Sequence, residues 1–193
     1  MAKLLDRIAR DLNQSGYTKR STESRKWLQQ TIVSMGTISR TSLINDPQRS
    51  VSDATIGLMH CFFYDPKLKQ KLPYYDKFPL VLPIEGYSDG FLGLNFHYLP
   101  INLRVHLLDK LYDLVNNTRF DMSTRIQASY KVLNAASRYK EFKPCLKRYL
   151  SDHIASRMVA IEPEHWETAI FLPVQMFTKA SAQEVWAESR NKI

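Results

Sequence analysis

The chain has 193 residues, of which 44% are hydrophobic and 11% aromatic, and its formal net charge is +8. This composition excludes global disorder, and the length fits one domain, with or without an appended arm. The positive charge indicates an acidic partner, either nucleic acid or an acidic protein surface. The alternative is a small basic protein whose charge only keeps it soluble.

The first fifty residues predict two amphipathic helices and a linker. Residues 2–14 and 22–35 each place apolar side chains at helical spacing, with charged side chains on the other face. Residues 37–53 are rich in Ser, Thr and Asn, which is typical of an extended linker. Through Ser50 there are nine Lys or Arg against four Asp or Glu, a net charge of +5. We therefore expect residues 1–53 to form a basic helical arm that reaches toward neighbouring subunits and does not fold back onto the core.

The stretch from Gly57 to Pro100 predicts an antiparallel sheet. Three runs rich in aromatic and branched apolar residues, 58–64, 78–84 and 91–99, are separated by turn residues. Their dense and roughly alternating apolar positions indicate the hydrophobic centre of the protein. We expect six side chains there to be largely buried: Phe62, Leu80, Leu82, Leu92, Leu94 and Phe96.

The connection between the second and third runs predicts a hairpin. Residues 85–90 contain Gly86 and Gly90, which can adopt the positive φ that a tight hairpin loop requires. Pro79 and Pro83 lack a backbone donor, so the strand that contains them should lie at a sheet edge, carry a bulge or end early.

Helices are expected to follow the sheet. Leucines at helical spacing follow Pro100 and predict a helix that begins there, because the first turn of a helix does not need the backbone N–H that proline lacks. Asn116-Asn117 should end this helix. The remaining expected elements are helices over 121–136, 142–157 and 181–192, a strand over 158–161 and a one-turn helix over 162–166. Together these elements predict an α+β fold, in which helices enclose a small antiparallel sheet, open or barrel-like, in a core domain of residues 54–193.

The residue pattern contains no recognisable metal or nucleophile motif. None of the five histidines is paired with another at i, i+3 or i, i+4 spacing, and neither cysteine lies in a CxxC motif. His60 and Cys61 should point to opposite faces of a strand, although either one could face His97 across the sheet. Cys61 and Cys145 both lie in apolar surroundings, which is typical of packed thiols in a reducing cytoplasm.

Four carboxylates lie at expected turns or strand ends: Asp65, Asp76, Glu85 and Asp89. From the sequence alone, a catalytic pair of an acid and a base would give the same pattern of carboxylates. Asx-turns, however, explain the three aspartates without catalysis. We therefore expect no enzyme activity, no catalytic residue, no metal and no cofactor.

No apolar run approaches the length of about 18 residues that a membrane helix requires. The first thirteen residues also lack the apolar core of a signal peptide. We expect a soluble protein with no membrane partner.

The segment 138–157 is the strongest candidate for contact with an acidic partner. It holds six Lys or Arg against two Asp or Glu, a net charge of +4, with aromatic residues interleaved. On the expected helix 142–157, Lys143 and Lys147 would share one face. The alternative is a solvated helix face whose aromatic side chains pack inward. The candidate residues for contact with nucleic acid or an acidic partner are Lys140, Lys143, Lys147 and Arg148.

Five phrases in the second half of the chain are similar to a family of virion proteins from T-even-type tailed bacteriophages. They are YDPKLKQKLPYYDKFPLVLPI, DGFLGLNFHYLP, LRVHLLDKLYDL, FKPCLKRYLSDHI and EHWETAIFLPVQMF. The resemblance covers about residues 57 to 190 and leaves the first fifty or so unmatched. It carries no catalytic motif.

The resemblance implies a non-enzymatic protein of the virion, made in the cytoplasm of the bacterial host. The first hypothesis is a structural component near the packaged DNA or along the head–tail axis, within an assembly of several subunits and other virion proteins. The alternative is a DNA end protector, which would bind the termini of the packaged double-stranded DNA through a basic surface without base specificity.

Overall fold

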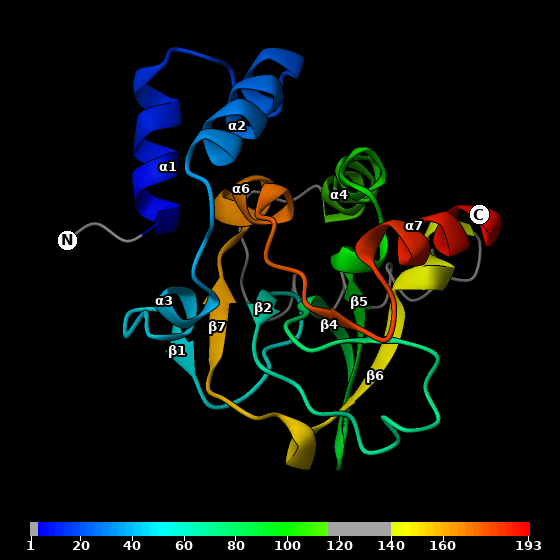
Figure 1. The fold of residues 1–193 in the computed structure, drawn as a ribbon. Coiled ribbons are helices and arrows are strands. Elements are labelled where there is room, and N and C mark those ends of the chain that lie inside the picture. The colour runs from blue at the N-terminus through cyan, green and yellow to red at the C-terminus, as the bar shows by residue number, and fades with distance from the viewer. Residues whose placement is uncertain (1–3, 116–139) are drawn as a thin grey trace.

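A computed structural model describes residues 4–115 and 140–193 of the chain. Its centre is a six-stranded antiparallel sheet with the strand order β1-β7-β2-β4-β5-β6 (Figure 1). In that order the strands are Ser50–Val51, Met158–Ile161, Met59–Cys61, Leu80–Tyr87, Gly90–Asn95 and Leu146–Leu150. A second, two-stranded sheet pairs β3 (Tyr75–Asp76) with β8 (Phe177–Thr178).

The larger sheet is open and does not close into a barrel, since β1 and β6 form its two edges. The α+β class is confirmed, whereas the barrel-like alternative is wrong, and the sheet contains two strands more than the sequence predicted. The two additional strands are β1, in the segment expected to be a linker, and β6, in a segment expected to be helical.

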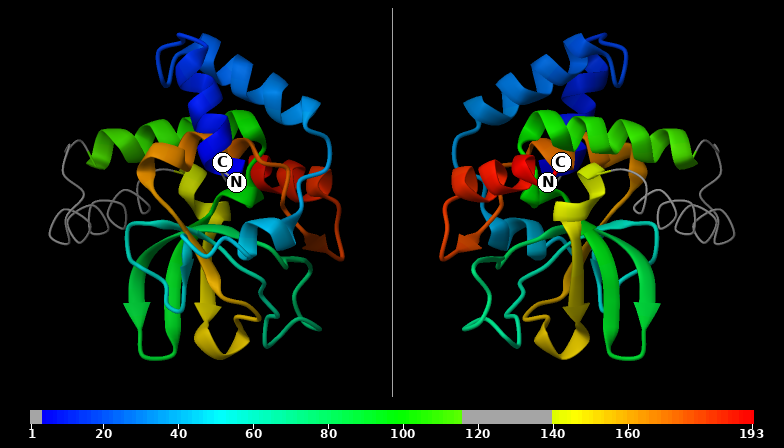
Figure 2. Two further views of the ribbon diagram at one scale, coloured as in Figure 1. Left: turned by 90° about the vertical axis from the view of Figure 1, so that its left-hand side faces the viewer. Right: turned by 90° about the vertical axis from the view of Figure 1, so that its right-hand side faces the viewer.

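Most of the helices gather at one end of the sheet, as two perpendicular views agree, and one short helix lies beside β1 (Figure 1, Figure 2). The α-helices among the described residues are α1 (Leu4–Gln14), α2 (Thr22–Ser34), α3 (Arg40–Ile44), α4 (Ile101–Val115), α6 (Trp166–Phe171) and α7 (Ala182–Asn191). Short 3₁₀ turns are η1 (Phe96–Tyr98), η2 (Lys140–Cys145), η3 (Ser151–His153) and η4 (Pro163–His165).

The β4–β5 hairpin follows the sequence prediction closely. The two strands pair from Val81↔Asn95 to Tyr87↔Gly90, and the register shifts between Pro83 and Glu85. This bulge is one of the three outcomes expected for a proline that cannot donate to the ladder. Gly90 has the expected positive φ, +149°, whereas Gly86 does not and pairs with Phe91 inside the strand.

The apolar side chains of the sheet fill two separate clusters. One joins the helices to the sheet and includes Leu82 and Leu94, and the other, on the opposite face, contains Phe62, Phe91 and Tyr149. The prediction for the hydrophobic centre is confirmed, because five of its six side chains are at most 3% exposed and the sixth, Leu92, is half-buried.

The N-terminal helices pack onto this core, contrary to expectation. Their apolar stripes are buried in the same cluster as the sheet: Leu5, Ile8, Leu12, Leu28 and Ile32. On the polar side, Arg25 Nε donates to Glu167 of α6 at 2.9 Å, and Arg49 Nη2 donates to Asp6 at 2.7 Å. Both stripes find their apolar partner within this chain, so they do not need one from a neighbouring subunit. The division of the chain at residue 53 stays a prediction.

The expected helix 142–157 is wrong. The chain forms the 3₁₀ turn η2, the strand β6 and the 3₁₀ turn η3 over this segment. Pro144 cannot donate a helical hydrogen bond, and the free edge of β5 offers a complete ladder to residues 146–150. The expected helix over 121–136 and its neighbour Asn116-Asn117 lie outside the described residues.

The last elements agree with the sequence prediction. The helix that follows Pro100 is present as α4, the strand 158–161 as β7 and the one-turn helix as η4. In α7, Val185 is fully buried, and Trp186 Nε1 donates to the carbonyl of His97 at 2.8 Å. This hydrogen bond holds α7 beside β6 and η1.

Candidate nucleic-acid interface

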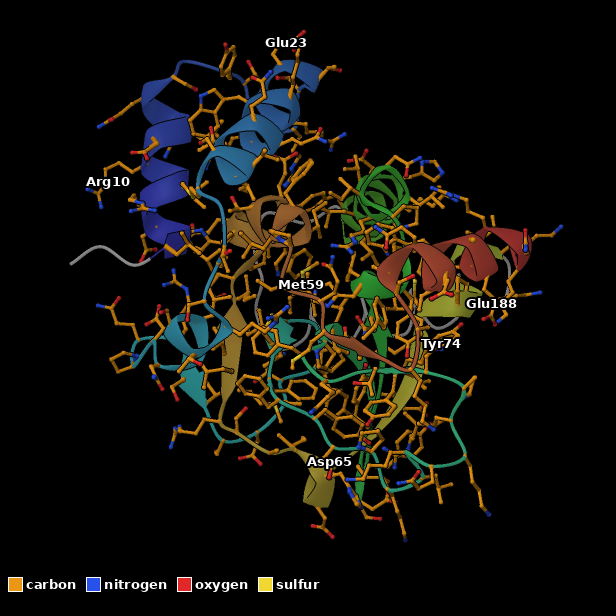
Figure 3. All side chains as sticks on the ribbon, in the orientation of Figure 1. Arg10, Glu23, Met59, Asp65, Tyr74 and Glu188 are labelled. Carbon is orange, nitrogen blue, oxygen red and sulfur yellow. The ribbon has the colours of Figure 1, made fainter. Side chains whose placement is uncertain are left out.

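A pocket of about 390 Å³ lies between the loop that follows β2, strand β6 and helix α7. We call it the tyrosine pocket, because its lining includes Tyr64, Tyr74, Tyr75, Tyr98 and Tyr149. Tyr74 lies next to Glu188 of α7 (Figure 3). The Tyr74 hydroxyl and the Glu188 carboxylate interact, which connects the loop to the helix and joins two walls of the pocket.

The tyrosine rings of the pocket pack against one another in pairs. The ring centroids of Tyr64 and Tyr149 are 4.9 Å apart, and those of Tyr74 and Tyr98 are 5.9 Å apart. Burial raises the pKa of Tyr98 and that of Tyr149 well above the ordinary value, so both hydroxyls stay protonated. Tyr74 is half-buried, which leaves part of its ring accessible from the pocket.

Three cations line the same pocket: Lys147, Arg148 and Lys192. Lys147 is half-buried, and its Nζ lies 4.1 Å from the centroid of the Tyr98 ring. Burial lowers the pKa of this lysine, because the charged form has lost hydrating water. Lys192 is exposed, and its Nζ donates to Glu188 Oε1 at 2.5 Å.

The loop beside the pocket carries three more lysines. Lys67, Lys69 and Lys71 form what we call the lysine rim, next to the lining residues Pro66 and Leu72. Lys69 pairs with Asp65 at 2.8 Å, whereas Lys67 and Lys71 are exposed.

An exposed lysine on another segment fixes the conformation of this loop. Lys179 Nζ donates to the carbonyl oxygens of Lys69, Gln70 and Leu72 at 2.7 to 2.9 Å. Three carbonyl acceptors on one ammonium group hold the turn in place, so the rim is presented by an ordered loop. Sequence reasoning missed this rim. The available signal was three lysines at alternate positions in KLKQK, two residues before Tyr74-Tyr75.

The four cations expected from the sequence do not form one stripe. Lys147 and Arg148 line the tyrosine pocket, whereas Lys140 and Lys143 are exposed on η2 and do not. Because β6 is a strand, Lys147 and Arg148 point to opposite faces of the sheet. Arg148 forms an ion pair with Asp89 of the hairpin, and its guanidinium lies 4.3 Å from the centroid of the Tyr87 ring. Contact of these four residues with nucleic acid stays a prediction.

Behind the pocket lies a buried Asp–His pair. His97 Nδ1 donates to Asp76 Oδ2 at 2.7 Å, and Asn95 Nδ2 donates to the hydroxyl of Tyr149 at 3.0 Å. Burial alone would raise the pKa of Asp76, but His97 and two backbone amides hold it below its usual range. Burial lowers the pKa of His97, so the pair consists of a carboxylate and a neutral imidazole.

This pair resembles half of a catalytic triad, but its geometry indicates a structural role. The side chains of Asp76 and His97 are at most 1% exposed, and the carboxylate is taken up by hydrogen bonds within the protein. Asp76 Oδ1 accepts from the amide of Phe78 at 3.0 Å, which is the Asx-turn expected from the sequence. Burial raises the pKa of Cys145 to about 12 and that of Cys61 further, so neither thiol is an activated nucleophile.

His60 does not face His97. Its Nδ1 donates to the carbonyl of Leu58 at 2.8 Å, and its Nε2 accepts from the amide of Thr55 at 3.3 Å. Within residues 4–115 and 140–193, no group of three or more His, Cys, Asp or Glu side chains could hold a metal ion. No helix in this part of the chain is both long and apolar enough to span a membrane.

Comparisons with known proteins give one match. A sequence model of the family described as "Phage T4 terminal DNA protecting protein" matches residues 3–189. The match therefore includes the N-terminal helices. The resemblance carried by the five sequence phrases did not extend to these helices. No curated protein and no solved structure matches the chain. Since the match spans nearly the whole sequence, the chain belongs to the Phage T4 terminal DNA protecting protein family.

Proposed function

We propose that this protein binds the ends of packaged phage DNA and shields them from nucleases. The observation that carries the proposal is the family match over residues 3–189, whose description names a protective role and no reaction. The role is therefore non-catalytic, and the protein acts where the DNA termini lie in the virion. End protection takes precedence over the general structural role that the sequence also suggested.

The tyrosine pocket and the lysine rim supply the chemistry that such a role needs. Exposed lysines neutralise phosphates and release condensed counterions, which gives affinity for DNA of any sequence. Lys67, Lys71 and Lys192 are exposed around a pocket whose walls are aromatic. Cations beside accessible rings are typical of surfaces that follow a nucleic-acid backbone and stack its bases.

Exonuclease protection tests the function directly. Linear duplex is incubated with a processive exonuclease and increasing amounts of the purified protein, and the surviving full-length DNA is measured. We expect protection that saturates at a small number of protein molecules per DNA end. Closed circular DNA of equal length should compete poorly. Degradation at the unprotected rate, even with protein in large excess, would refute the proposal.

Two pairs of charge reversals locate the binding surface. Lys67→Glu with Lys71→Glu changes the rim, and Lys140→Glu with Lys143→Glu is the matched pair on η2. The rim pair should weaken binding and lower the salt slope by about two counterions, while the η2 pair changes both little. The reverse result would move the DNA contact to η2 and reject the pocket as the interface.

A further inference from the structure

We infer that the tyrosine pocket holds one unpaired nucleotide from the end of a DNA strand, with its base on Tyr74 and its phosphate between Lys147 and Lys192. This inference rests on the proposed function and specifies how the protein distinguishes an end from the body of a duplex.

The volume of the pocket limits what can enter it. Pockets that bind small molecules typically have volumes of about 300–1,000 Å³, and this one, at about 390 Å³, lies in the lower part of that range. A nucleotide fits such a space, whereas the cross-section of a duplex does not. Any DNA group that fills the pocket must therefore have left the double helix.

Tyr74 is the residue best placed to receive a base. Its ring is half-buried, its centroid lies 5.9 Å from that of Tyr98, and its hydroxyl interacts with the Glu188 carboxylate. These contacts fix the ring without covering it, so little side-chain freedom is lost when a base stacks on it. Stacking accepts every base, which suits a protein that acts on termini whatever their sequence.

Lys147 and Lys192 are placed to receive the phosphate. The Lys147 ammonium group lies over the Tyr98 ring, in a position with little hydrating water. A phosphate oxygen there would supply the hydrogen-bond acceptors that water no longer provides. Lys192 directly follows α7 and is held by Glu188 of this helix. The other carboxylate of the lining, Asp76, is already occupied by His97.

Preference for ends follows from this geometry. Opening the terminal base pair breaks stacking on one side, whereas extruding an internal base breaks it on both sides. The pocket is therefore filled at the lowest cost by a frayed or unpaired terminal nucleotide. The lysine rim holds the adjoining backbone regardless of whether an end is near.

The test compares three DNA ligands of equal length. One is linear with an unpaired terminal nucleotide, one is linear with each terminal base pair locked by an interstrand cross-link, and one is a closed circle. The terminal base of the first ligand is 2-aminopurine, whose fluorescence reports unstacking from DNA and contact with tyrosine. We expect the open end to bind at least about tenfold more tightly than the locked end, with a change in fluorescence. A parallel pair of open ends, with and without a 5′-phosphate, measures the contribution of the phosphate.

Matched variants assign the effect to the pocket. Tyr74→Ala should remove most of the difference between open and locked ends. Tyr17→Ala, at a tyrosine that is 43% exposed on the connection between α1 and α2, should retain it. Lys192→Gln should reduce the advantage of a phosphorylated end, whereas Arg10→Gln, on the exposed side of α1, should not.

Each result separates the inference from the proposed function. Equal affinity for open and locked ends, with both better than the circle, overturns the inference and leaves end protection intact. Equal affinity for all three ligands overturns both. The comparison uses the unmodified protein, so it does not depend on how any variant folds.

Discussion

Replacing Asp76 with Ala should lower the free energy of unfolding by about 3–5 kcal/mol. The carboxylate accepts four hydrogen bonds from three parts of the chain. The amides of Phe78 and Met176 donate at 3.0 and 2.9 Å, His97 Nδ1 at 2.7 Å and Asn95 Nδ2 at 3.4 Å. Alanine leaves both amides without this acceptor, and each unsatisfied buried group costs about 1–3 kcal/mol. The loss is a large fraction of a typical stability of about 5–15 kcal/mol.

Urea denaturation measures this loss. With a slope of about 2 kcal/mol/M, the midpoint should fall by about 2 M while the slope stays constant. Asp76→Asn is the matched control, because its side-chain oxygen still accepts from the two amides while the charge facing His97 is gone. It should lose about half as much stability. Two variants that both unfold within about 1 kcal/mol of the parent protein would refute the reasoning.

The same network predicts a dependence on pH. The pKa of Asp76 lies below its ordinary value, so in acid the unfolded chain takes up the proton first. Its stabilising contribution is complete above the ordinary Asp pKa of about 3.9 and is lost as the pH falls through the folded value. Asp76→Asn should remove this part of the acid sensitivity.

Three further predictions concern the fold. Gly90→Ala should lower the free energy of unfolding by at least about 2 kcal/mol, because the added Cβ would lie 2.0 Å from the carbonyl oxygen of Tyr149 at a φ of +149°. In the control Gly86→Ala the Cβ would meet only Ile56, at 3.9 Å, so the loss in the same urea assay should be less than about 1 kcal/mol. Burial lowers the pKa of His60 to about 4, so this residue should lower stability by about 3 kcal/mol between pH 6.5 and 4, and a profile that is shallower by this amount in His60→Gln identifies the residue. Deleting residues 1–53 should expose the apolar surface beneath α1 and α2 and cause aggregation, whereas a soluble fragment 54–193 with a sharp urea transition would support a separate N-terminal unit.

Local chemistry determined the parts of the fold that the sequence predicted. The β4–β5 hairpin follows from Gly90, from the turn residues before it and from a proline that forces a bulge. Helix α7 follows from Ser181 and Glu184, which form a complete capping box. In these elements each local preference agrees with the final structure, so short-range reasoning is sufficient.

Long-range pairing determined the parts that it did not predict. Residues 142–150 have apolar side chains at a spacing that suits a helix, yet the open edge of β5 pairs with them as a strand. The Asp76–His97 pair joins residues 21 apart in sequence, with no spacing rule to reveal it. The loop that carries the lysine rim is held by Lys179, more than a hundred residues further along the chain. None of these contacts has a signature within a short window of sequence.

The two halves of the proposed interface should differ in their response to salt. Binding through the lysine rim depends on counterion release, so it weakens steeply as the salt concentration rises. Stacking of a terminal base on Tyr74 involves no counterions and should change little. Raising the salt concentration should therefore weaken the rim contacts equally for circular DNA and for open linear ends, and the ratio of the two affinities should fall only by the single phosphate contact of the pocket. A surface that selected ends through phosphates alone would lose its preference for ends as the salt concentration rises, because all of that preference would depend on counterion release. A preference for open ends that persists at high salt is thus the behaviour expected of a protein that gains its affinity from the backbone and its selectivity from stacking in the pocket.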